Sequence, residues 1–121
     1  MALPTSPLTD ATTTTLHVAL RSLAARQRIH AQNIANIETP GYTARRVDFE
    51  GALRRAVAAG RPTDATAAVT RTNDPATPNG NNVQIDQETL ALSETGLRYQ
   101  LLTQAIDARF RGLRNAIGKG A

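Results

Sequence analysis

The chain has 121 residues, of which 40% are hydrophobic but only 3% aromatic, so it can form one modest domain but lacks the large side chains that fill a thick core. Its formal charge is +4, but the basic residues are spread along the chain, which disfavours a nucleic-acid-binding protein. Cysteine is absent, which excludes disulfides and thiolate metal sites. We therefore expect a small domain that gains part of its stability from neighbouring molecules.

The first 15 residues are rich in threonine and proline, and we expect them to be loose at first. They contain neither the basic n-region nor the apolar h-region of a cleavable signal peptide. No apolar stretch approaches the roughly 20 residues that cross a membrane as a helix. We therefore expect no direct membrane span, and any export must use another signal.

A long helix is predicted to begin between Asp10 and Thr15. Its inward positions alternate in steps of four and three, which is typical of a coiled-coil seam and also of the core face of a helical hairpin. These positions are Leu16, Leu20, Leu23, Gln27, His30, Ile34 and Ile37. Two of the seven are polar, so we expect Gln27 and His30 to lie in a helix–helix seam or at an interface.

The segment 31–42, AQNIANIETPGY, ends this helix, and we expect the rest of the chain to be organised around it. Pro40 disfavours the helical conformation at Thr39, and Gly41 can adopt the positive φ that a type II turn requires. The segment therefore predicts a tight turn directly after the helix.

The side-chain amides of Asn33 and Asn36 stand where the helix ends. Helix ends leave backbone groups without partners, and a side-chain amide can both donate and accept hydrogen bonds. We expect the two asparagines to tie the helix end to the turn or to a neighbouring subunit; solvent-facing side chains are the alternative.

The middle segment, residues 43–83, is predicted to be irregular or partly β. A short helix is expected at 49–59, ending at Gly60, and a brief strand is possible at 68–72. Residues 61–82 are rich in proline, threonine and asparagine, so we expect an extended arm that lies along a neighbouring subunit or stays mobile.

A second long helix is predicted in residues 84–121, with Asp86 as its N-cap, Glu88 in its first turn and its end at about Ile117, before Gly118. Its apolar residues form two stripes. The first comprises Leu90, Leu97, Leu101, Ala105 and Ala108. The second comprises Leu92, Tyr99, Leu102, Ile106, Phe110, Leu113 and Ile117, and we expect it to be the outward face that contacts other subunits.

These elements predict a mainly α fold, in which the N-terminal helix with its turn (1–42) and the C-terminal helix (84–121) pack as an antiparallel hairpin or coiled coil. The two helices together would form one helical core domain, and residues 43–83 would form the middle segment or arm. Each helix is long compared with the thickness of a small domain, which favours a rod shape.

No catalytic, cofactor or metal site is predicted. The two histidines, His17 and His30, are thirteen residues apart on one helix and cannot meet as a metal pair. Two pairs of acidic residues are each spaced by two: Asp48 with Glu50, and Asp86 with Glu88. This spacing puts the members of a pair on different faces of a helix, so we expect solvent-facing or capping roles and not an enzyme.

Two blocks of residues resemble a known family. The first block is Asn33, Ile34, Ala35, Asn36, Thr39, Pro40, Gly41, Tyr42, Asp48 and Phe49. The second is Asn81, Asn82 and Val83 after Gly80, with Asp86 and Glu88 beyond. They are similar to the N- and C-terminal signatures of the bacterial flagellar rod and hook proteins, most of all to the proximal rod variant. Gln32 and Arg46 depart from that pattern, where relatives often have a serine and an acid.

The resemblance implies a structural subunit that polymerises helically and transmits torque from the membrane ring to the distal rod. It also implies that the partners are the chain itself, other rod subunits, and membrane-ring and rod-adaptor proteins. The protein would lie in the periplasmic part of the flagellar basal body, after export through the flagellar type III system without a cleaved signal peptide. The alternatives are another flagellar axial subunit and, less favoured, a small basic helical protein that binds nucleic acid.

Overall fold

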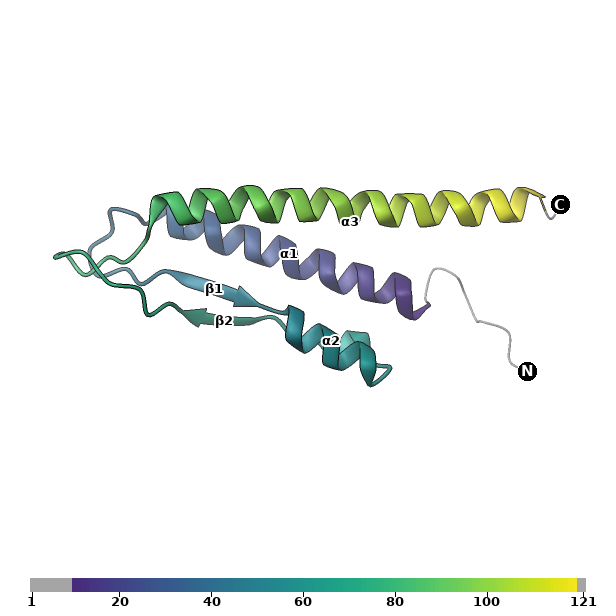
Figure 1. Cartoon of the computed structure of the whole chain (residues 1–121), viewed down its shortest axis with the longest axis horizontal. Helices are drawn as coiled ribbons and strands as arrows, with labels where there is room; N and C mark the ends of the chain where they lie inside the picture. The colour runs from purple at the N-terminus through teal and green to yellow at the C-terminus, as the bar shows by residue number, and fades with distance from the viewer. Residues whose placement is uncertain (1–9, 120–121) are drawn as a thin grey trace.

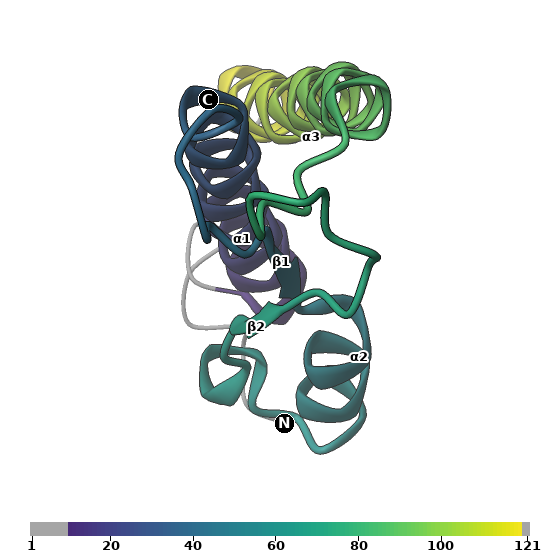
Figure 2. The ribbon, with the colours of Figure 1, turned by 90° about the vertical axis from the view of Figure 1, so that its left-hand side faces the viewer.

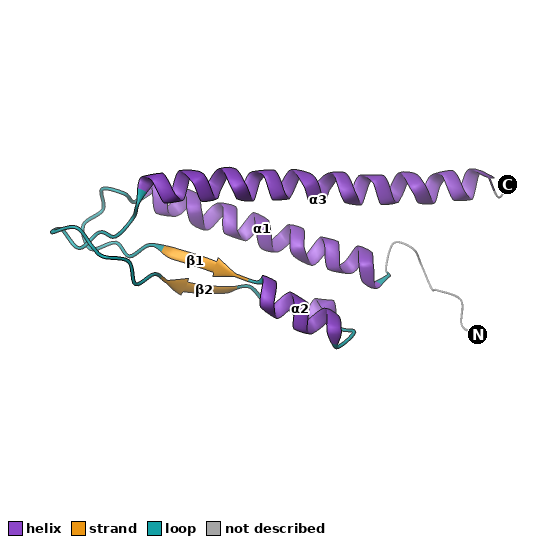
Figure 3. Ribbon diagram, viewed as in Figure 1, coloured by secondary structure: helices purple, strands orange, loops and turns teal. Residues whose placement is uncertain are grey.

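The computed structural model describes residues 10–119, so the loose start expected for the chain lies largely outside the described residues. The elements follow in the order α1 (Ala11–Ala35), β1 (Arg45–Asp48), α2 (Glu50–Ala58), the 3-10 helix η1 (Pro62–Asp64), β2 (Ala68–Arg71) and α3 (Ile85–Lys119). The predicted fold class is confirmed: the chain is mainly helical, with long helices near both ends and a small sheet in the middle (Figure 3).

The two long helices form an antiparallel hairpin (Figure 1). Helix α1 lies between α3 on one side and the layer of strands and α2 on the other, as the view from the turn end also shows (Figure 2). The end of α3 extends past the beginning of α1, so its last turns are not covered by α1 (Figure 1).

Helix α1 begins within the predicted range because Asp10 acts as its N-cap. The Asp10 carboxylate accepts a hydrogen bond from the backbone N–H of Thr13 at 2.8 Å, which lowers the pKa of the Asp10 carboxyl. Arg109 of α3 binds the same carboxylate and donates from Nε to Thr13 Oγ1 at 2.9 Å. The beginning of α1 is thereby fixed to α3.

Both predicted ends of α3 need correction. The helix begins at Ile85, so Asp86 lies inside its first turn and is not the N-cap. The helix also continues through Gly118 to Lys119, and Gly118 does not adopt the positive φ of a helix-terminating glycine. A glycine inside a helix costs only about 1 kcal/mol, so its presence alone does not stop one.

The short helix expected at 49–59 spans Glu50–Ala58. Two backbone hydrogen bonds cap its C-terminal end, from Gly60 N to Val57 O at 3.0 Å and from Arg61 N to Ala56 O at 2.8 Å. This pair of bonds is a Schellman motif, and Gly60 supplies its left-handed residue with φ +75°. Gly60 is therefore a structural position and not a neutral part of a loose arm.

The segment 61–82, predicted as an arm against a neighbour or a mobile stretch, is attached in part to its own chain. Strand β2 pairs antiparallel with β1, with Arg71 opposite Arg45 and Ala68 opposite Asp48. Directly after β2, Thr72 N donates to Ala44 O, just before β1, at 2.9 Å. Backbone hydrogen bonds, which no side-chain pattern reveals, hold this segment in place.

The apolar core is small and is centred on Leu23, Val47 and Phe49, which come from α1, β1 and the residue before α2. Leu102 of α3 packs against this cluster with several other partly buried side chains. The predicted seam of α1 is only partly buried: Leu23 and His30 are buried, and the other five positions are half-buried.

The two stripes of α3 were assigned to the wrong sides. Five members of the stripe expected to face outward are half-buried: Leu92, Leu102, Ile106, Phe110 and Leu113. Tyr99 and Ile117 of that stripe are exposed, whereas Leu90, Leu97 and Leu101 of the other stripe are 67%, 57% and 56% exposed. The face of α3 that packs against α1 also carries the buried polar residues Glu88 and Thr95, so the pattern of apolar residues alone does not show which face is buried.

Candidate functional site

The two sequence blocks meet at the turn end of the hairpin, where α1 ends and α3 begins (Figure 1). Six side chains form a polar cluster there, which we call the clasp: His30, Asn33, Tyr42, Asn81, Asn82 and Glu88. They come from α1, from the turn after it, from the segment before α3 and from the first turn of α3.

Asn33 is the centre of the clasp and is fully buried, with 0% of its surface exposed. Its Nδ2 donates to Arg45 O at 2.8 Å and to Glu88 Oε1 at 3.1 Å. Its Oδ1 accepts from Arg45 N at 3.0 Å and from the Tyr42 hydroxyl at 3.1 Å. One amide thus connects α1, the turn, β1 and α3, and all four of its hydrogen-bonding positions are filled.

Glu88 and His30 join the two long helices directly. The distance from His30 Nδ1 to Glu88 Oε2 is 2.7 Å, and both residues are buried. The prediction that His30 is a polar contact of the helix seam is confirmed, whereas a solvent-facing role for Glu88 is wrong. Burial of a carboxylate requires partners, and Glu88 has them in His30 and in the Asn33 amide.

Asn81 brings the second sequence block onto the end of α1. Its Nδ2 donates to Asn36 O and to Thr39 O, both at 2.8 Å. Its Oδ1 accepts from Val83 N at 2.8 Å, which fixes the entry into α3. A residue 45 positions away from Asn36 thus binds the carbonyl at the C-cap of α1 and a carbonyl of the turn that follows it.

Asn82 fixes the middle segment in the same way. Its Oδ1 accepts from Ala44 N at 2.6 Å, just before β1. Its Nδ2 donates to Thr72 Oγ1 at 3.0 Å and to Asp74 O at 3.2 Å, just after β2. Adjacent asparagines therefore hold the helix end on one side and both strands on the other.

The predicted turn has the expected geometry: Tyr42 N donates to Thr39 O at 3.2 Å, and Gly41 has φ +74°. A second glycine loop packs against it, because Gly41 N donates to Asn79 O at 2.8 Å. A Cβ atom added at Gly80 would lie 3.2 Å from the Gly41 Cα, so this close approach requires glycine there.

The structure brings some of the other candidate residues to the clasp and leaves some outside it. Asn36 donates from its side chain to Gln32 O at 2.8 Å and accepts from Thr39 Oγ1 at 3.1 Å, so it holds the helix end and the turn together, as expected for this residue. Phe49 belongs to the apolar core. Candidates on or near the surface are Ile34 and Val83, which are half-buried, and Ala35, Pro40 and Asp48, which are exposed.

A second polar joint, missed from the sequence, lies between α1 and the start of α2. Arg26 donates from Nη1 and Nη2 to the two oxygens of Glu50 at 2.6 and 2.7 Å, and from Nη2 to Val47 O at 2.9 Å. Its guanidinium carbon lies 4.6 Å from the centre of the Phe49 ring. The hydrogen bonds from Arg26 hold the pKa of Glu50 down at about 2. Glu50 is exposed, as expected, but its carboxylate is also paired with Arg26, which the sequence did not indicate.

The arrangement of the clasp is that of a joint between segments. Within residues 10–119 no group of three or more histidine and acidic side chains is placed to hold a metal ion. In the same part of the chain no helix combines the length and the apolar character that a membrane crossing requires. The clasp side chains bind one another and the backbone, so their chemistry is to fix geometry.

No family model matches the chain. It is 30% identical over 123 residues to the flagellar basal body rod protein FlgB of Escherichia coli K12, an alignment that covers 84% of this chain and 89% of the relative. The chain belongs to the FlgB family of flagellar basal body rod proteins.

Two other FlgB proteins show the same relationship. The Bacillus subtilis FlgB is 28% identical over 118 residues, covering 87% of this chain and 92% of the relative. The Cereibacter sphaeroides FlgB is 36% identical over 107 residues, covering 76% of this chain and 82% of the relative. The resemblance inferred from the two blocks is thus confirmed and narrowed to FlgB, and with it the prediction of a structural component of the basal-body rod.

Proposed function

We propose that the chain is a structural subunit of the proximal rod, which polymerises helically and passes torque from the membrane ring to the distal rod. The observation that carries the proposal is that α3 is apolar on two faces and only one of them is covered by its own chain. An exposed row of leucines on a long helix is the surface that a subunit needs for contact with neighbours.

The clasp supports the mechanical part of the proposal. A subunit that carries torque must keep its two long helices in fixed relation at their joined end. Hydrogen bonds from Asn33 and Asn81 tie α1 to β1, to the turn and to α3, and the network is buried. Such a network resists sliding of one helix along the other, because any shift leaves buried polar groups without partners.

The partners in this proposal are other copies of the chain, other rod subunits, and the membrane-ring and rod-adaptor proteins. The chain would reach the periplasmic part of the basal body through the flagellar type III export system, without a cleaved signal peptide. The proposed role is structural and includes no catalytic, cofactor or metal site.

Deletion of the gene in its own organism, followed by electron microscopy of purified basal bodies, tests the proposal. We expect membrane rings without any rod, loss of motility, and rescue of both by the intact gene. A rod stub in the deletion strain would place the subunit at a distal position. Complete rods in that strain would contradict a rod function altogether.

A further inference from the structure

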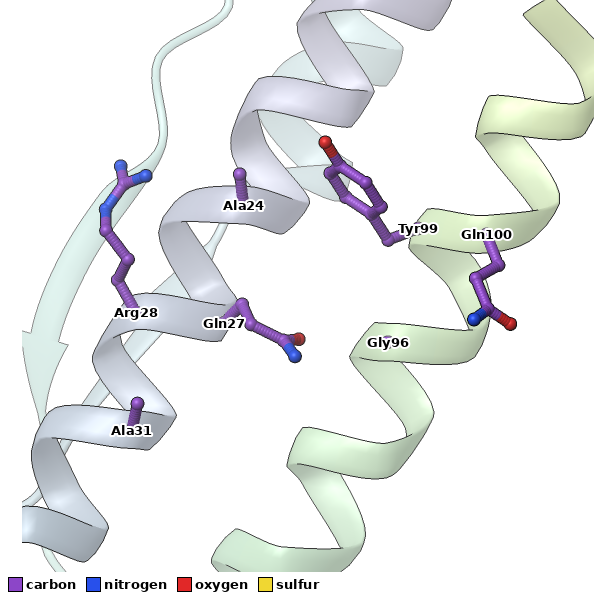
Figure 4. Close-up of a pocket in the computed structure, with 7 residues that line it drawn as sticks. All are labelled: Ala24, Gln27, Arg28, Ala31, Gly96, Tyr99 and Gln100. Atoms are coloured by element: carbon purple, nitrogen blue, oxygen red, sulfur yellow. The ribbon is translucent and has the colours of Figure 1, made fainter. Parts of the chain in front are cut away.

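One flank of the hairpin carries an open groove between α1 and α3, with a free volume of about 500 Å³ (Figure 4). Ala24 and Ala31 of α1 and Gly96 of α3 leave space between the larger side chains of the walls, so the groove stays open. Figure 4 shows Gln27 pointing across the groove toward α3 and the Tyr99 ring reaching toward α1. The residues that line the groove include Ala24, Gln27, Arg28, Ala31, Gly96 and Tyr99.

Two polar features of the groove lack partners in the described chain. The Oε1 atom of Gln27 is buried and accepts no hydrogen bond from any residue between 10 and 119. Arg28 is exposed at the outer edge of the α1 wall, with its side chain directed away from α3 (Figure 4), and no acidic side chain in that range pairs with it. The groove therefore favours an occupant with an apolar surface, a hydrogen-bond donor and a negative charge.

The exposed face of α3 supplies two of these properties, an apolar surface and a negative charge. Leu90, Leu97 and Leu101 are exposed and lie on the opposite side of the helix from the buried Glu88 and Thr95. Glu94 lies on the leucine face, is exposed and has no ion-pair partner among residues 10–119. Because the same helix forms one wall of the groove, these leucines cannot enter the groove of their own chain.

The two surfaces share one spacing along their helices. The wall from α1 presents small, basic and small residues in the order Ala24, Arg28 and Ala31. The free face of α3 presents large, acidic and large residues in the order Leu90, Glu94 and Leu97. Both sets follow the pattern i, i+4, i+7, which places their members on one helix face.

We propose that this groove binds the free face of α3 from a second copy of the chain, with an Arg28–Glu94 ion pair between the two copies. The inference rests on the proposed function, because it supplies the contact by which a rod subunit polymerises. It commits the interface to a second copy, since the leucine face of the same sequence fits the groove in size, charge and spacing.

The polarity of the helices sets the register. Helix α3 runs antiparallel to α1 in one chain (Figure 1). A second α3 that also runs antiparallel to α1 is parallel to the first, so both chains point the same way. Leu90 then lies over Ala31 and Leu97 over Ala24, and Glu94 lies level with Gln27, about 1.5 Å along the axis from Arg28. A groove on one copy that binds a different surface of the next is a heterologous contact, which can continue as an open helical array.

Charge reversal tests the ion pair in cells whose only copy of the gene carries the variant. Arg28→Glu and Glu94→Arg should each lower the yield of complete rods by about tenfold, because each places like charges against each other. The double variant restores opposite charges and should restore most of that yield. Equal defects in the double and single variants would overturn the pairing.

Cross-linking tests the occupant, and the cysteine-free chain is suited to it. Cells would express Ala31→Cys and Leu90→Cys copies together, and their basal bodies would be treated with a mild oxidant. We expect a covalent dimer of the chain only when both variants are present. Thr103→Cys, on an exposed residue about 20 Å further along α3, should give none with Ala31→Cys.

The outcomes separate this inference from the proposed function. Complete rods and motile cells without the covalent dimer would overturn the inference and leave the rod function intact. A cross-link from position 31 to a protein of another mass would also overturn it, since the occupant would then be a different subunit. Complete rods in the deletion strain would instead contradict the rod function itself.

Discussion

Replacing Asn33 with leucine should remove the centre of the clasp with little change in side-chain size. The asparagine makes four hydrogen bonds and is fully buried. Leucine can replace none of them, so both backbone groups of Arg45, the Tyr42 hydroxyl and one oxygen of Glu88 lose a partner. Glu88 is buried, and the Tyr42 and Arg45 groups are part-buried, so water replaces the lost bonds only in part.

The magnitude follows from the number of bonds. A hydrogen bond in a protein contributes about 1 kcal/mol net, and a buried polar group left without a partner costs about 1–3 kcal/mol. The burial of an apolar leucine offsets about 1–2 kcal/mol of this. We therefore expect Asn33→Leu to lower the free energy of unfolding by about 3–5 kcal/mol, which is much of the total stability of a small domain.

Urea titration of the purified chain, followed by the helix signal in far-ultraviolet circular dichroism, measures this loss. Every sample contains trimethylamine N-oxide at the same concentration, because this osmolyte stabilises the folded state. Asn36→Leu is the matched control, because Asn36 is only half-buried and its side chain makes local bonds to Gln32 and Thr39. It should cost about 1 kcal/mol or less. Equal losses in the two variants would refute the central role of Asn33.

Three further predictions follow from single positions. Gly41→Val should lower the free energy of unfolding in the same urea titration by about 1–3 kcal/mol and impair motility, because Gly41 has φ +74°. Gly112→Val, in a helix with open space around it, should be nearly neutral in that titration. The pKa of Glu50 lies near 2, below its ordinary 4.5, so the stability contributed by its ion pair is complete above pH 4.5 and is lost as the pH falls toward 2. Glu50→Gln should flatten this part of the stability–pH curve, and an unchanged curve would contradict the pairing. Phe110→Asp should lower the helix content of the isolated chain, because Phe110 packs against the start of α1. Leu101→Asp, on the exposed face, should leave the helix content unchanged and block rod assembly. Loss of helix in both variants would show that Leu101 is buried in the monomer.

Local chemistry explains the features that were predictable from the sequence. Asp10 caps α1 through a bond to Thr13, three residues away, and Pro40 with Gly41 forms a turn within four residues. The spacing of apolar residues also indicated two long helices and the short helix at Glu50–Ala58. Each of these signals depends on neighbours in the sequence, which is why no tertiary information was needed.

Long-range contacts explain the features that were not predictable. Glu88 in the first turn of a helix has the position of an ordinary dipole partner, and only its approach to His30, 58 residues away, makes it a buried group. The brief strand expected at 68–72 is confirmed as β2, but its partner β1 was not predicted, because Val47 is the one buried residue among its four. The periodicity of α3 showed two apolar stripes, but which stripe α1 covers depends on polar partners across the seam.

The distribution of polar and apolar contacts along the hairpin explains why such a subunit would depend on its neighbours. The fully buried apolar cluster consists of Leu23, Val47 and Phe49, which is small for a chain of this length. At the turn end, the clasp compensates with hydrogen bonds that are satisfied in only one arrangement, so it fixes the register of the two helices. At the opposite end, α3 extends past α1, and Ile117 is exposed there (Figure 1). No clasp joins the helices at that end; Arg109 is the last residue of α3 that bonds to the beginning of α1 among those described. Within residues 10–119, the hydrogen bonds of the clasp fix the turn end, and the exposed end of α3 leaves a surface that the proposed neighbours would cover.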